Sequence, residues 1–343
     1  MIGRAAQRAL AAGVLALAAA SLCACSGVQT PLDPAADQAA SIKTIWNAML
    51  VVCGFMYLLV LTLLGWALAR ARRKPVEGPP AEHLTEAEPL LERGVAGWAA
   101  LIVAGLVVLI TVSFLVDRSL AETGPDPLNI RVSANQWWWQ IEYQGRTPDE
   151  TFVTANELHL PLGRPARITL VANDVIHSFW VPNLSGKEDL IPGRTNYLTL
   201  TPRRIGEFRG QCAEFCGLEH AKMALLVQVQ DPRVFEAWRQ QQRQATVEPV
   251  GFQQVQGKQV FQGKACVMCH RIGGTDAGAS VGPDLTHLAS RRTLAAGTLT
   301  NDRGSLQAWI ADPQGVKPGP AMPRVTLSSD ELNALTAYLE SLK

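Results

Sequence analysis

The chain has 343 residues, a formal net charge of +1 and a sequence pI of about 7.6. This near-neutral balance excludes a general electrostatic attraction to nucleic acid, and the length accommodates roughly two or three domains. Apolar residues are concentrated in three stretches before residue 117, whereas the remaining sequence is typical of soluble protein. We therefore expect a multidomain chain with a membrane-associated N-terminal part followed by soluble domains.

The first apolar stretch, residues 10–22, follows a basic start and is too short to span a bilayer. This arrangement predicts a signal peptide over residues 1–25. The stretch closes in Leu-Cys-Ala-Cys-Ser, which resembles bacterial lipoprotein signals with Cys25 as the lipidated first residue of the mature protein. Ordinary signal cleavage nearby, which would discard both cysteines of this stretch, is the alternative.

The second and third apolar stretches, residues 44–69 and 94–116, each meet the length needed to cross ~30 Å of hydrocarbon. They predict a two-helix transmembrane hairpin over residues 40–118. Four basic residues follow the first of these stretches almost directly, so the connecting loop 70–93 is expected on the cytoplasmic side. The predicted location is the bacterial cytoplasmic membrane, crossed more than once, with the N-terminus and the soluble domains on the periplasmic side. A buried hairpin of a soluble protein is the alternative.

Between residues 128 and 231 the sequence changes to short alternating segments separated by turn residues. This pattern predicts an all-β sandwich or barrel. The expected strands are residues 129–134, 158–160, 166–171, 197–201 and 224–229. Residues 232–244 then favour one helix, and residues 232–250 as a whole are interpreted as a helix and a polar linker.

The last part of the chain, residues 251–343, has apolar residues at helical spacing between loops rich in Gly and Pro. The expected helices include residues 255–261, 305–310 and 330–342. Ser328 or Ser329 can cap the last of them, with Glu331 in its first turn. We predict a small all-α module, which needs a central group against which its helices can bury.

A copper-binding pattern occupies the loop that contains Cys212, Cys216, His220 and Met223. Thiolate, imidazole and thioether together suit copper, whereas zinc rarely uses a thioether. A mononuclear blue-copper site would use one cysteine and two histidines. Two cysteines four residues apart instead favour two coppers bridged by both sulfurs, each with one imidazole and one weak axial ligand.

The second imidazole must come from outside this loop. His177 is the candidate, because the other histidines before residue 251 lie in the predicted cytoplasmic loop or lack a comparable setting. The backbone carbonyl of Glu214 is the candidate for the last ligand. The alternatives are a disulfide between the two cysteines and a zinc site of two cysteines and two histidines, which would leave the methionine unused.

The pattern Cys-x-Glu-x-Cys-Gly-x-x-His-x-x-Met over residues 212–223 resembles subunit II of haem–copper cytochrome c oxidases, as do His177-Ser178 and the segment 186–194. The resemblance covers roughly residues 40–240 and implies a cupredoxin-like Greek-key fold with a binuclear CuA centre. It also implies that the Glu214 side chain binds magnesium at the interface with subunit I. Trp137, the first of three consecutive tryptophans, is implied as the point where electrons arrive from an external cytochrome. Packing under the barrel is the alternative for these tryptophans.

A haem-attachment sequence, Cys-x-x-Cys-His, lies at residues 266–270. Cys266 and Cys269 are expected to form thioethers to the haem vinyl groups, and His270 is expected to bind the iron. Met322 is the one methionine beyond this motif, and its Pro-rich loop resembles the axial loop of small cytochromes c. His287 is the rival for the sixth ligand.

The segment Gly-Pro-Asp-Leu at residues 282–285 resembles the part of these cytochromes whose proline carbonyl holds the other nitrogen of the axial histidine. Pro283 is therefore a candidate to orient His270. Residues 251–343 as a whole resemble a class I cytochrome c with covalent haem c. A zinc site or a disulfide at the Cys-x-x-Cys-His motif is the alternative.

Together these features resemble subunit II of a caa3-type oxidase, in which a cytochrome c domain is fused to the copper domain. The resemblance implies a relay from haem c to CuA and on to subunit I, in a complex that reduces oxygen to water with proton translocation. The expected partners are subunit I, other oxidase subunits, the membrane, and an upstream cytochrome or quinol-oxidising complex, with no nucleic acid. The alternatives are a tethered electron carrier for another reductase, such as one that reduces nitrous oxide, and a copper-delivery protein. The two predicted spans argue against the first alternative, and the haem argues against the second.

Overall fold

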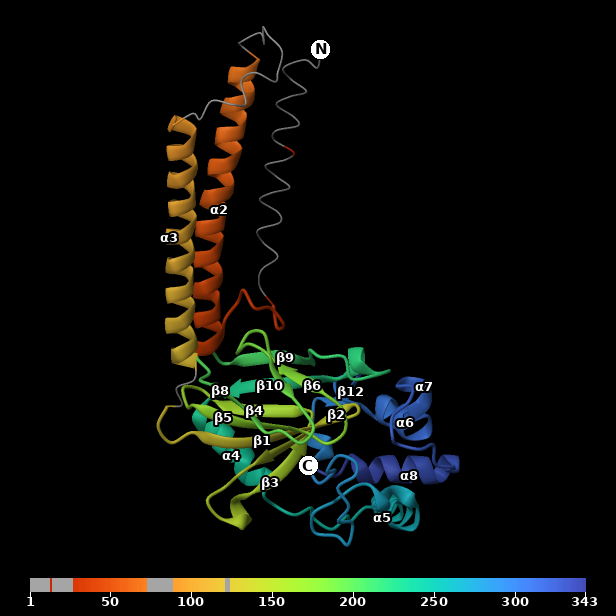
Figure 1. Cartoon of the computed structure of the whole chain (residues 1–343). Helices are drawn as coiled ribbons and strands as arrows, with labels where there is room; N and C mark the ends of the chain where they lie inside the picture. The colour runs from red at the N-terminus through yellow and green to blue at the C-terminus, as the bar shows by residue number, and fades with distance from the viewer. Residues whose placement is uncertain (1–12, 14–26, 73–88, 121–123) are drawn as a thin grey trace. The chain divides into compact units, whose positions relative to one another are not determined.

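The structure is a computed structural model that describes residue 13 and residues 27–72, 89–120 and 124–343 (Figure 1). Cys25, all of the predicted signal peptide except residue 13, and most of the predicted cytoplasmic loop lie outside the described residues. The copper-binding and haem-binding sequences belong to one compact unit of the described chain, and residues 41–122 form another.

Two long apolar helices, α2 (Asp37–Ala71) and α3 (Pro89–Leu120), contain the predicted spans. They have 35 and 32 residues, more than the ~20 that cross a hydrocarbon core. The helices touch each other, since a Cβ added at Gly105 would lie 3.7 Å from Cγ1 of Val52. Large apolar side chains along both helices, among them Leu58 and Ile110, are exposed. A surface of this kind is stable when lipid or another protein covers it, so both helices are suited to a membrane by length and composition.

The strands of the soluble part form two five-stranded sheets, in the orders β3-β2-β1-β5-β8 and β4-β10-β9-β6-β7. Their bounds are β1 (Leu128–Asn135), β2 (Trp138–Tyr143), β3 (Phe152–Ala155), β4 (Glu157–Pro161), β5 (Ala166–Ala172), β6 (His177–Trp180), β7 (Glu188–Leu190), β8 (Asn196–Leu200), β9 (Gly206–Cys212) and β10 (Ala224–Gln230). Strands β1 and β5 pair in parallel, as do β4 and β10, while the other pairs are antiparallel.

One apolar core lies between the two sheets and receives side chains from both of them. Alternation along β5 shows how the sequence builds it, because Ala166, Ile168 and Leu170 are buried while the residues between them are less so. Trp139 of β2 is also buried, with its ring 5.9 Å from that of Phe179. The predicted cupredoxin-like β-sandwich is confirmed.

Helix α4 (Pro232–Gln242) follows the last strand and packs on the sandwich. Asp231 caps its first turn by accepting a hydrogen bond from the backbone N–H of Arg233, and Pro232 occupies the first helical position. The ring of Trp238 stacks on His159 with centroids 3.9 Å apart. The helix ends two residues before the predicted end, and the linker to the next domain follows it.

The C-terminal domain is helical, as predicted. Its helices are α5 (Phe252–Gly263), α6 (Arg303–Ala311), α7 (Pro313–Val316) and α8 (Ser329–Leu339), with short 3-10 turns and the small strands β11 (Thr293–Leu294) and β12 (Leu299–Thr300). Ser328 and Glu331 form a reciprocal capping box at the start of α8. Helices α5 and α8 meet at Gly257, where a Cβ would lie 2.0 Å from the carbonyl oxygen of Ala334.

Candidate copper and haem sites

The candidate copper ligands come from three neighbouring strands of one sheet and the loop that joins two of them. His177 begins β6, Cys212 ends β9, and Met223 directly precedes β10. Because β6 pairs with β9 and β9 with β10, these residues meet at the same end of the sheet. The turn between β9 and β10 supplies Cys216 and His220.

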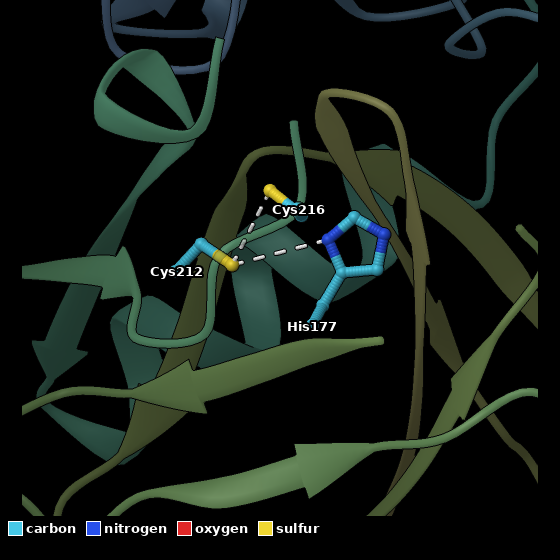
Figure 2. Close-up of side chains that lie close together, drawn as sticks. All are labelled: His177, Cys212 and Cys216. Carbon is cyan, nitrogen blue, oxygen red and sulfur yellow. Dashed lines mark hydrogen bonds between the residues drawn. The ribbon is translucent and has the colours of Figure 1, made fainter. Parts of the chain in front are cut away.

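The donor atoms gather around the two sulfurs (Figure 2). The Cys212 Sγ lies 3.8 Å from the Cys216 Sγ, 3.8 Å from Nδ1 of His177 and 3.2 Å from the backbone oxygen of Glu214. The Cys216 Sγ lies 3.6 Å from Nδ1 of His220 and 3.8 Å from the Met223 sulfur. The structure thus brings together every donor that the sequence predicts for this site.

The environment of the sulfurs favours metal binding. Both cysteines are free and buried. The hydrogen bond between the two cysteines lowers the pKa of the Cys212 thiol and raises the pKa of the Cys216 thiol. Burial and the charge on Cys212 raise the pKa of Cys216 further. Cations beside both sulfurs would stabilise the doubly deprotonated pair. The combination of sulfur, imidazole and thioether donors fits copper, since a zinc site would leave Met223 unused.

Asp174 orients His177 and was not identified from the sequence. Its Oδ1 lies 2.7 Å from Nε2 of His177, which leaves Nδ1 facing Cys212. Burial lowers the pKa of His177, but the hydrogen bonds to Cys212 and Asp174 raise it above its ordinary value overall. The signal in the sequence was an acid three residues before a candidate ligand.

The carbonyl of Cys216 is held by two side chains of the turn between β1 and β2. Nε2 of Gln136 donates to it at 2.7 Å, and the indole Nε1 of Trp137 donates at 3.0 Å. Gly217 lets them approach, because a Cβ there would lie 3.1 Å from both Nε2 of Gln136 and Cζ2 of Trp137. Gly217 also has a φ of 111°, in the region that favours glycine.

The candidate haem residues line one cavity of about 340 Å³. Cys266 and Cys269 lie on its wall together with His270 and Met322. Helices α5, α6 and α8 contribute the apolar side chains Phe261, Leu306, Ile310, Leu335 and Leu339. The central group that the small helical domain requires therefore has a place in the structure.

His270 is prepared to bind iron through one nitrogen. Its Nδ1 lies 2.8 Å from the carbonyl oxygen of Pro283, the candidate to orient the ring. Burial lowers the pKa of His270 below its ordinary value, so the neutral ring donates from Nδ1 and keeps Nε2 as an electron-pair donor. Gly282 fits closely beside the ring, since a Cβ there would lie 2.7 Å from Cε1.

The cavity also contains polar groups that suit a haem. The Nε of Arg291 and the Oγ1 of Thr293 are buried without a hydrogen-bond partner, and both residues line the cavity. A group with acidic substituents, such as haem, would satisfy them. His287 does not line the cavity, and its Nε2 instead lies 3.1 Å from the carbonyl oxygen of Gln244. This placement favours Met322 over His287.

Trp137 connects the two sites. Its indole N–H donates to the backbone oxygen of the candidate copper ligand Cys216, and the same residue lines the cavity that Cys266 and His270 also line. Trp138 also lines the cavity, whereas Trp139 is buried in the sandwich core. A copper-type site and a haem-type site joined through one aromatic residue define an electron-transfer protein.

Comparison with known proteins agrees with this class. Residues 147–230 match the family described as cytochrome c oxidase subunit II, periplasmic domain, and residues 254–343 match cytochrome c. Cytochrome c oxidase subunit 2 of Alkalihalophilus pseudofirmus is 34% identical over 323 residues, which cover 92% of this chain and 91% of the relative. The protein of the same name from Bacillus subtilis is 31% identical over 297 residues, covering 81% and 82%.

The chain therefore belongs to the cytochrome c oxidase subunit II family, and it carries a C-terminal cytochrome c domain. Membership makes it part of an oxidoreductase complex in a membrane. It also implies copper of the CuA type in the β-sandwich and haem c in the helical domain.

Proposed function

We propose that the chain is subunit II of a caa3-type cytochrome c oxidase. In this role it accepts electrons at haem c, passes them to the binuclear CuA centre and delivers them to subunit I, where oxygen is reduced to water with proton translocation. The chain has six histidines in all, and those not assigned to the copper and haem sites are too few for an oxygen-reducing haem–copper centre of its own.

The proposed copper ligands are the sulfurs of Cys212, Cys216 and Met223, the rings of His177 and His220, and the backbone oxygen of Glu214. The proposed haem attachments are Cys266 and Cys269, with His270 and Met322 on the iron and Pro283 orienting His270. When bound, these groups supply reversible one-electron chemistry. At the copper site the protein holds His177, Cys212, Cys216 and Met223 in buried positions, which would keep the structural change per electron small.

The position of Trp137 is the observation that carries the proposal. On the copper side, Nε1 of Trp137 donates a 3.0 Å hydrogen bond to the carbonyl oxygen of Cys216. On the haem side, Trp137 lines the cavity of the candidate haem site. We propose that electrons from the haem of the same chain arrive at the copper site through Trp137, in place of electrons from an external cytochrome.

We propose a topology with two membrane spans in a bacterial cytoplasmic membrane. Helices α2 and α3 supply the spans, and Arg70 and Arg72 at the end of α2 favour a cytoplasmic connection. The N-terminus, the copper domain and the haem domain would then be periplasmic. A lipid on Cys25, after removal of residues 1–24, would add a second anchor to the same side.

The proposed partners are subunit I, other oxidase subunits, and an upstream cytochrome or quinol-oxidising complex that reduces haem c. We further propose that the Glu214 carboxylate binds magnesium where this chain meets subunit I. The side chain is 45% exposed and lies 3.7 Å from Nζ of Lys187. It is therefore accessible to a neighbouring subunit while its backbone oxygen faces Cys212.

The composition of the purified complex tests the function. The chain should be expressed with its native partners and isolated from membranes in mild detergent. We expect two coppers and one covalent haem c per chain, a haem–copper subunit I in the same preparation, and magnesium that is lost in Glu214→Gln. One zinc per chain in place of copper, or a chain that purifies without any oxidase subunit, would refute the proposed function.

A further inference from the structure

We propose that Lys317 of the haem domain and Glu157 of the β-sandwich are reciprocal buried anchors that hold the haem domain docked beside Trp137. The haem-to-copper step would then occur in a fixed complex and would not wait for a swing of a tethered domain. This inference rests on the proposed function, because it assigns these residues to positioning within that electron transfer.

Lys317 is a cation of the haem domain that is satisfied mainly by the copper domain. Its side chain is only 2% exposed. Its Nζ donates to the carbonyl oxygens of Trp137 at 2.7 Å, Lys222 at 2.8 Å and Ala295 at 3.2 Å. An ammonium has three donors and no acceptor, so three carbonyls match it fully. Two of them belong to the β-sandwich side of the contact.

The Lys317 side chain carries its charge at neutral pH. Its pKa is lowered to about 8, mainly by burial and also by the charge on Lys222, while Glu219 and Cys216 act in the opposite direction. Since neutral pH lies below this value, the ammonium form predominates. A buried ammonium that lost these carbonyls without reaching water would be strongly unfavourable.

Glu157 makes the opposite contact from the copper domain. It lies at the start of β4 and is only 2% exposed. Its Oε1 accepts hydrogen bonds from the backbone N–H groups of Arg292 and of Thr293, the latter at 3.2 Å. Both amides belong to the haem domain. Its Oε2 lies 3.9 Å from Nε2 of His159, within the sandwich.

The two contacts are complementary, because each domain supplies a buried charge and backbone partners for the other's charge. Separation of the domains would remove charge-assisted hydrogen bonds from both, and such bonds are roughly twice as strong as neutral ones. Lesser contacts support the same arrangement. Nζ of Lys222 donates to the carbonyl oxygen of Val316 at 3.1 Å. The backbone N–H of Ala224 donates to the carbonyl oxygen of Ala296 at 3.0 Å.

The anchored segments are also those that carry the redox sites. Lys317 begins the loop that leads to Met322, and within that loop a Cβ at Gly319 would lie 3.5 Å from the Trp137 ring. On the copper side, Lys222 directly precedes Met223. One buried cation therefore fixes the backbone of Trp137, the approach to the copper site and the loop of the proposed iron ligand.

Lys317→Met in the complete purified oxidase tests this role, because it keeps the length of the side chain and removes the ammonium. After photoreduction of haem c, we expect electron transfer from haem to CuA to slow by about tenfold or more as the docked population falls. The absorption spectra and metal content should remain those of the wild type. Hydrogen exchange at the amides of Arg292 and Thr293 should become faster, which reports undocking independently of activity.

Two further variants sharpen the test. Glu157→Gln removes the second anchor's charge with little change of shape and should shift both readouts in the same direction. If the Lys317→Met oxidase does not assemble, the Glu157→Gln variant alone tests the proposed docking. Lys258→Met is the matched control, since the ammonium of Lys258 pairs with the carboxylate of Glu248 at 2.6 Å and takes part in neither anchor. Both readouts should stay at the wild-type values in this control.

If Lys317→Met and Glu157→Gln both kept the wild-type transfer rate and the wild-type amide exchange, the proposal that these residues anchor the haem domain would be wrong. The failure of the proposed function would look different. In that case haem c of the wild-type complex would not reduce CuA at all, whatever residue stands at position 317.

Discussion

Individual residues at the copper site differ in how far the sequence reveals them. Cys212, Cys216, His220 and Met223 lie in one short loop, so their spacing alone indicates a shared metal. His177 is distant in the sequence, and its selection rests on elimination among the histidines before residue 251. Asp174 was missed, because an acid near a histidine has no distinctive pattern until the fold places its Oδ1 2.7 Å from the ring.

Met322 provides a test at the residue scale. Met322→Leu keeps an apolar side chain in the cavity and removes the thioether. We expect the haem potential to fall by roughly 0.1–0.2 V, a fraction of the ~0.8 V range that axial ligands span. Redox titration of haem c in the purified complex measures the change.

Met268→Leu is the matched control, because Met268 lies between the two haem cysteines and is 71% exposed. The haem potential of the Met268→Leu protein should equal that of the wild type. A Met322→Leu protein with an unchanged potential would show that another side chain binds the iron, and His287 would have to leave Gln244 to do so.

The crossing of α5 and α8 shows what element prediction leaves out. Apolar spacing predicted both helices, and Ser328 was among the two candidates for the cap of α8. The crossing itself was not predicted, because it depends on the absence of a side chain at Gly257, where the two backbones come together. A glycine within a helix more often indicates weak propensity than a close contact.

Gly257→Ala tests this crossing at the element scale. The added methyl group would meet the Ala334 carbonyl and the Tyr338 side chain, so the helices must separate. We expect the free energy of unfolding of the haem domain to fall by about 1–3 kcal/mol. Denaturant titration of the complex, followed through the haem absorption, measures it.

Gly263→Ala is the control on the same helix, since a Cβ there would meet nothing within 4 Å. Alanine has the higher helix propensity, so this variant should be neutral or slightly more stable. Equal stability of the two variants would contradict the close crossing.

At the scale of the whole molecule, the sequence predicted the kinds of domain more completely than their arrangement. The linker after α4 indicated a tether, which alone would give an effective concentration of order mM. The structure adds a docked interface with buried charges. Lys317 in a Pro- and Gly-rich loop and Glu157 at the start of a strand gave no local sign of burial, because their partners are backbone groups far away in the sequence.

The kinetics of CuA reduction test the central claim most directly. In the purified complex, haem c is reduced by a single flash without added cytochrome, and CuA absorption is followed over a wide range of protein concentration. We predict a first-order reduction of CuA whose rate constant does not depend on protein concentration and is smaller in Trp137→Phe. A rate that rises with concentration, or a CuA centre that is reduced only after a soluble carrier is added, would contradict a relay within one chain.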